Sequence, residues 1–128
     1  MYKMKLKNII TDLGLIKGRG AIDFVKFNKL TESKMDITFS IDTTKCSQGA
    51  TFEQYVQMRI ISNSLIYFKM QSDELLPKLH PESCLCEIID SQVVNNNLDI
   101  QPQLKHILLT SYDSIFEFVC SDIEFLIE

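Results

Sequence analysis

The chain has 128 residues, of which 45% are hydrophobic and 23% charged, and its formal net charge at pH 7 is −4. This size and composition are typical of one globular domain, so we expect residues 1–128 to form a single domain. No stretch approaches the roughly 18 uninterrupted apolar residues of a membrane span, and the first residues do not match an export signal. We therefore expect a cytoplasmic protein without a membrane partner.

Charge is divided unevenly along the sequence. Residues 1–34 contain eight Lys or Arg and three acids, a balance of +5, whereas residues 35–128 contain five and fourteen, a balance of −9. The summed charge of a protein attracts or repels other molecules at long range and says little about the fold. The asymmetry therefore bears on the choice of binding partner.

Apolar residues recur at helical spacing near the start of the chain. Leu6, Ile9, Ile10 and Leu13 have this spacing, and Gly14 follows them. The pattern predicts one amphipathic N-terminal helix that ends at the glycine. After a glycine-containing loop the period changes, and most of the remaining chain shows the alternation that is typical of β-strands.

The first alternating segments predict a hairpin. Ile22, Phe24, Val25 and Phe27 indicate one strand, and residues 35–41 alternate between apolar and polar side chains. The polar connection between the two segments is short enough for an antiparallel hairpin.

Further strands are expected later in the chain. Apolar runs predict them at 56–60, 65–70 and 105–110, and residues 63–64 form either a turn between two strands or a bend within one strand. The proline-containing segment that follows is expected to be mostly loop, with one short helical turn at 73–76.

The apolar phase reverses near the C-terminus. Phe116, Phe118 and Cys120 are at even positions, whereas apolar residues from 123 to 127 are at odd positions, so Ser121 and Asp122 must hold a bulge or a tight turn. The pattern as a whole predicts an α+β fold that is mainly antiparallel β. We expect a curled sheet, a sandwich or a partly open barrel, with the N-terminal helix on one face or edge.

The cysteines and histidines offer a weak metal or catalytic site. His80, Cys84, Cys86 and His106 are residue types that bind zinc, but a Cys-x-Cys pair lacks the usual knuckle spacing. Cys84 beside either histidine is also the one nucleophile–base pair, and nothing around it indicates a lowered thiol pKa. We therefore expect no metal, no cofactor and no catalytic residue. The four thiols are expected to be reduced and mostly packed in the core: Cys46, Cys84, Cys86 and Cys120.

Two features argue against a nucleic-acid partner. The basic residues near the N-terminus are few and have no aromatic platform among them, and the acidic remainder of the chain repels phosphates. The opposite partner, a basic protein, is favoured by the excess of acids in the second half of the chain.

Four acids near the C-terminus are the predicted partner-binding residues. Asp113, Glu117, Asp122 and Glu124 lie among alternating apolar residues, and few lysines balance them. We expect them to share a solvent-facing surface that binds a basic protein, with a merely solvated face as the alternative.

A resemblance makes this expectation more specific. The segment from Cys86 to Val94, followed by the segment from Leu104 to Cys120, resembles the closing half of small β-rich bacterial proteins, several of which are similar to immunity proteins of contact-dependent toxin systems. The resemblance covers the C-terminal third of the chain. It implies a noncatalytic immunity protein that neutralises a basic toxin domain, for example a nuclease. A secretion-type chaperone and, from another class, a small hydrolase or metal enzyme are the alternatives; the oligomeric state stays open.

Overall fold

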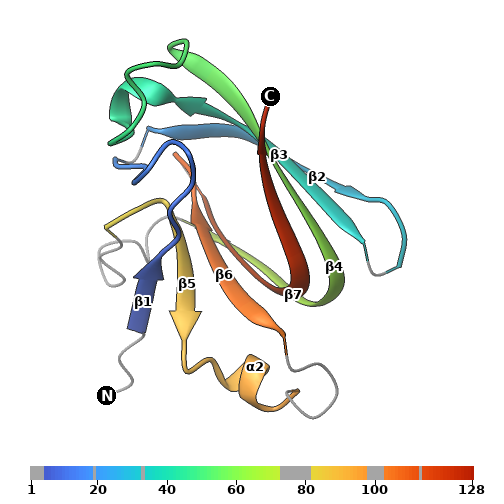
Figure 1. Ribbon diagram of the computed structural model, residues 1–128. Helices are drawn as coiled ribbons and strands as arrows, with labels where there is room; N and C mark the ends of the chain where they lie inside the picture. Colours follow the sequence, from blue (N-terminus) through green and yellow to red (C-terminus); the bar gives the residue numbers. More distant parts are fainter. Residues whose placement is uncertain (1–4, 19, 33, 73–81, 98–102, 113) are drawn as a thin grey trace.

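The computed structural model describes residues 5–18, 20–32, 34–72, 82–97, 103–112 and 114–128 (Figure 1). Within these residues, seven strands form one antiparallel sheet in the order β1-β5-β6-β7-β4-β3-β2. Mainly antiparallel β-structure is therefore confirmed.

The strands are β1 (Lys5–Asn8), β2 (Ile22–Lys29), β3 (Met35–Asp42), β4 (Tyr55–Ser72), β5 (Leu85–Ile89), β6 (Lys105–Thr110) and β7 (Ser114–Ile127). Two short helical segments accompany them, the 3-10 turn η1 (Thr43–Lys45) and the helix α2 (Gln92–Asn95). Neither is long and apolar enough to cross a membrane, and the described residues hold no helix that is.

The predicted N-terminal helix is wrong. Residues 5–8 form the edge strand β1, which pairs with β5, and a tight turn follows in which the Gly14 amide donates to the Thr11 carbonyl at 2.9 Å. Gly14 adopts a φ of 73°, which ends any helix there. Ile10 consequently faces solvent, while Leu13 and Ile16 are fully buried in the core. Pairing with β5 gives the edge strand backbone partners that the sequence pattern does not reveal.

Most predicted strands are confirmed. The hairpin of β2 and β3 is antiparallel, and β6 covers the predicted residues 105–110. Residues 55–72 form one continuous strand with a bend at Ser64, where φ is 52°, so the bent-strand alternative for residues 63–64 holds. The helical turn predicted at 73–76 lies outside the described residues.

β4 and β7 bend at the same level and fold the sheet over on itself (Figure 1). Ser64 in β4 and Asp122 in β7 both have positive φ, and the β4–β7 register shifts between Ile61 and Tyr67. The irregularity predicted at residues 121–122 is thus confirmed. The bends divide the sheet into a first arm, made of β1, β5, β6 and residues 114–120 and 67–72, and a second arm. The second arm consists of β2, β3 and residues 55–62 and 123–127.

The core lies between the inner faces of the two arms. Phe39 and Met58 from the second arm and Ile107 and Phe118 from the first arm are among its fully buried side chains. A smaller apolar cluster covers part of the outer face of the first arm: Cys86, Ile88, Leu108 and Ile115. The outer face of the second arm carries no buried apolar cluster among the described residues, and it presents alternating polar side chains to solvent.

Candidate functional site

The structure brings together two of the four acids that were predicted to form one exposed surface. Asp122 and Glu124 are exposed on the part of β7 that follows the bend. Glu117 precedes the bend and is only 9% exposed, so its expected position on a solvent-facing surface is wrong. The side chain of Glu117 lies on the outer face of the first arm, where it is buried beside His106 and Gln71. Asp113 lies outside the described residues.

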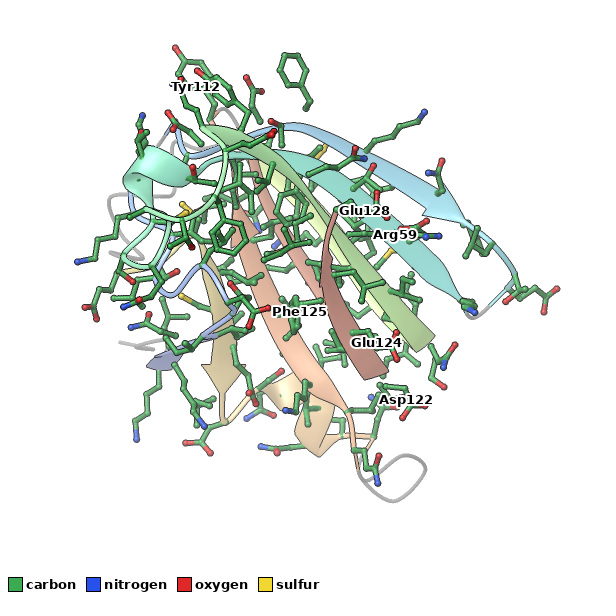
Figure 2. The ribbon with its side chains drawn as sticks, turned by 45° about the horizontal axis from the view of Figure 1, so that its top comes forward. Arg59, Tyr112, Asp122, Glu124, Phe125 and Glu128 are labelled. Atoms are coloured by element: carbon green, nitrogen blue, oxygen red, sulfur yellow. The ribbon has the colours of Figure 1, made fainter. Side chains whose placement is uncertain are left out.

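A row of carboxylates runs along the outer face of the second arm. Asp122, Glu124 and Glu128, here called the acidic row, lie on the exposed side of β7 and just beyond its end, and the exposed Leu126 lies between Glu124 and Glu128. Figure 2 shows the three side chains along this strand, with Phe125 on its opposite side. Sequence reasoning did not select Glu128, although it continues the same even-numbered alternation. The backbone amide of Glu128 donates to the Gln57 carbonyl at 2.8 Å, which fixes its position beside β4.

The cation closest in register to the acidic row already forms an ion pair with a buried aspartate. Arg59 lies on β4 directly opposite Leu126, between the levels of Glu124 and Glu128. Its Nε donates to Asp36 Oδ2 at 2.8 Å and its Nη2 lies 2.7 Å from the same oxygen. This hydrogen bond to Asp36 raises the pKa of Arg59. The charge of Glu128 also raises the pKa of Arg59, so this cation partly balances the last carboxylate of the row. Asp122 and Glu124 form no ion pair with it among the described contacts.

Lys26 is the other cation at this level of the second arm. It pairs with Thr38, and Thr38 pairs with Arg59, so Lys26 is three strands away from β7. Three strand spacings amount to about 14 Å, which exceeds the Debye length at physiological ionic strength. Lys26 therefore does little to neutralise the acidic row.

A buried polar network occupies the outer face of the first arm. His106 Nε2 lies 3.1 Å from Glu117 Oε1, and His106 Nδ1 lies 2.6 Å from Ser91 Oγ. Gln71 Nε2 donates to the second oxygen of Glu117 at 3.2 Å, and the amide of Val94 donates to Ser91 Oγ at 3.3 Å. Because an ionised carboxylate only accepts hydrogen bonds, His106 donates to it through Nε2.

This network has the residue types of a hydrolytic triad but the environment of a structural contact. The relative exposure of Ser91 is 4% and that of His106 is 6%, and both line a small cavity of about 120 Å³. Ser91 is also engaged as the N-cap of α2. A triad needs a nucleophile within reach of the scissile group, together with donors for the oxyanion. The network instead ties α2 to β6 and β7.

The thiols are placed for packing rather than for chemistry. All four cysteines are free, as predicted. Cys84 joins the main core, whereas Cys86 joins the cluster on the outer face of the first arm, so the two side chains lie in different environments. Burial raises the pKa of both thiols, which keeps them protonated near neutral pH. Among the residues that the structure describes, no three His, Cys, Asp or Glu side chains are grouped to hold a metal ion. His80 lies outside the described residues.

Comparison of the chain with protein-family models, with curated proteins and with solved structures finds no significant match.

Proposed function

We propose that this chain is a noncatalytic protein-binding protein and that the outer face of its second arm recognises a basic partner. The specific form of the proposal is an immunity protein that covers a basic toxin domain such as a nuclease. The observation that carries it is the acidic row: three exposed carboxylates along and just beyond the end of β7, beside an arginine whose ion pair is with the buried Asp36.

The rigidity of the row supports this function. Residues 124–127 of β7 pair with β4 in a continuous register, from Ile61 opposite Glu124 to Met58 opposite Ile127. Alternate residues on such a strand are about 7 Å apart, so Glu124 and the exposed Leu126 have fixed positions before any partner arrives. A preorganised charged surface loses little conformational entropy on binding, and it steers an oppositely charged partner during the encounter.

A nuclease is a suitable partner because its substrate groove must attract phosphates. Proteins that bind nucleic acid do so largely through clustered Lys and Arg, which are attracted equally by a row of carboxylates. The buried state of the Ser91–His106–Glu117 network and the raised thiol pKa values further favour binding over catalysis.

Affinity capture with three immobilised baits tests the proposal. The baits are the natural protein, the double variant Glu124→Lys/Glu128→Lys and a matched control, Asp12→Lys/Glu32→Lys, in which exposed acids away from the row undergo the same change of charge. We expect the natural protein and the control to retain the same basic protein at low salt, and the Glu124→Lys/Glu128→Lys bait to lose it. Recovery of no basic protein, or equal recovery on all three baits, contradicts the proposal.

A further inference from the structure

One exposed phenylalanine on the edge strand β2 has a backbone conformation that its own packing does not explain. Phe24 has a φ of 55°, and its side chain is 80% exposed. A bulky residue in the left-handed region carries strain on the order of 1–3 kcal/mol. The β2–β3 register shifts between Asp23 and Lys26, and this bulge turns the ring outward instead of into the predicted apolar face. Because the ring is hardly buried, packing within the fold does not offset the strain.

A cavity opens beside this ring. Its volume is about 390 Å³, and it is lined by Gly20, Ala21, Asp23, Phe24, Ser40, Asp42 and Tyr55. The Tyr55 ring, which is 61% exposed, comes from β4, directly across from Asp42 on β3. The described lining thus combines two aromatic side chains with two carboxylates, and none of its described residues is Lys or Arg.

Both carboxylates are held in place through one oxygen each. Asp23 Oδ1 accepts the amide of Phe24 at 2.8 Å, and Asp42 Oδ1 accepts the hydroxyl of Thr44 at 2.6 Å and its amide at 3.1 Å. The described contacts engage only Oδ1 of either residue. The hydrogen bond from the Thr44 side chain lowers the pKa of Asp42, so its carboxylate is ionised at neutral pH.

Among the described residues, a lysine lies beside the cavity. The ammonium group of Lys45 lies next to Gly20, and its charge contributes to the lowered pKa of Asp42. Lys45 is exposed and forms no ion pair within 4.0 Å of Asp23 or Asp42 among the described contacts. It therefore acts as a weak internal competitor for any cation that enters.

We infer that this cavity, the aromatic–carboxylate pocket, binds the guanidinium group of an arginine side chain on the basic partner. The inference rests on the proposed function, since it identifies the side chain that the partner inserts. Arginine fits better than lysine because its planar, weakly hydrated head stacks on aromatic rings and donates two parallel hydrogen bonds to a carboxylate.

The pocket is continuous with the acidic row. A neighbouring groove of about 430 Å³ shares Phe24 and Tyr55 with the pocket and reaches Gln57, and the cation Lys26 also lines it. Gln57 accepts the backbone hydrogen bond of Glu128, the last carboxylate of the row. Tyr112, which Figure 2 places at the upper edge of the molecule, lies near the same end, because its amide donates to the carbonyl of Ile22 at the start of β2. One partner surface can therefore contact the row and fill the pocket together.

A titration with a small probe tests the pocket without the partner. We expect N-acetyl-arginine amide to shift the backbone NMR signals of Phe24 and Tyr55 saturably in the full chain. The matched neutral probe, N-acetyl-citrulline amide, should leave them unchanged. Phe24→Ala should weaken arginine binding about two- to fivefold, as expected for an exposed cation–π contact, and Asp23→Asn should weaken it by a similar factor. Lys45→Ala should strengthen binding, because it removes the competing cation.

Several results overturn the inference: equal shifts from citrulline amide, shifts that map elsewhere, or unchanged affinity in both Phe24→Ala and Asp23→Asn. Both variants change exposed side chains, so an unaltered melting temperature is the expected check of the fold. Glu124→Lys/Glu128→Lys should still bind the arginine probe. If the arginine probe does not bind the pocket, but Glu124→Lys/Glu128→Lys still loses the partner, only the inference about the pocket is refuted. If Glu124→Lys/Glu128→Lys binds the partner as well as the natural protein does, the proposed function is refuted instead.

Discussion

The outer faces of the two arms carry similar residue types, but they place them in opposite environments. On the first arm, Glu117 is covered and hydrogen-bonded to His106 and Gln71. On the second arm, Glu124 lies seven positions further along the same strand and faces solvent. The bend at Asp122 separates them. Two acids of one strand therefore have different roles: Glu117 stabilises the fold, and Glu124 is accessible to a partner.

The largest expected difference between the arms is in the free energy of unfolding when the charge of each acid is reversed. Glu117→Lys buries a cation beside His106 and removes two hydrogen bonds, so we expect it to lower the free energy of unfolding by about 3–5 kcal/mol. Glu124→Lys changes an exposed position and should stay within about 0.5 kcal/mol. Urea denaturation of both variants measures the difference. Equal losses of stability would contradict the different environments of the two acids.

A second, smaller effect, the pH dependence of stability, tests whether Cys120 is buried in the core between the arms. Burial raises the pKa of Cys120 to about 11 from its ordinary value of 9.0. The folded state therefore holds the thiol proton more tightly than the unfolded state. This contribution to stability is complete below pH 9 and is lost as the pH rises toward 11. Denaturation of natural protein and Cys120→Ala across this range measures it. A pH dependence that is identical in the two proteins contradicts the buried, protonated thiol.

The smallest of the three effects concerns the attachment of α2 to the first arm. Ser91→Ala removes the hydrogen bond to His106 and the N-cap contact to Val94, so we expect a loss of about 1–2 kcal/mol. Asn95→Ala changes an exposed residue of the same helix and serves as the control. Equal melting temperatures for the two variants would show that the network does not hold the helix.

Local alternation in the sequence predicts the strands well, because each strand leaves its own period-two pattern. This holds for residues 22–27 and 35–41, and the reversed phase after Cys120 also locates the bend at Asp122. Spacing alone fails at the N-terminus. There the apolar residues fit a helix. Instead β1 forms because β5, a strand far away in the sequence, offers its edge, as in the Asn8–Cys86 and Lys5–Ile89 pairs.

The candidate site is less predictable than the fold. The alternation places Glu117 and Glu124 on polar positions, but it does not say which outer face other residues cover. Burial of Glu117 depends on His106 and Gln71, whose strands pair with β7 on either side. Phe24 likewise fits the apolar face of a strand, and only the bulge in β2 turns it outward.

The rate of association with the captured basic partner tests the central claim most directly. We expect the rate constant of the natural protein to fall as salt is added, because long-range attraction to the acidic row is screened. Glu124→Lys/Glu128→Lys should associate about tenfold more slowly at low salt and with a weaker salt dependence, while Asp12→Lys/Glu32→Lys should behave more like the natural protein. Equal rates and equal salt dependence in the natural protein and the Glu124→Lys/Glu128→Lys variant would contradict the account.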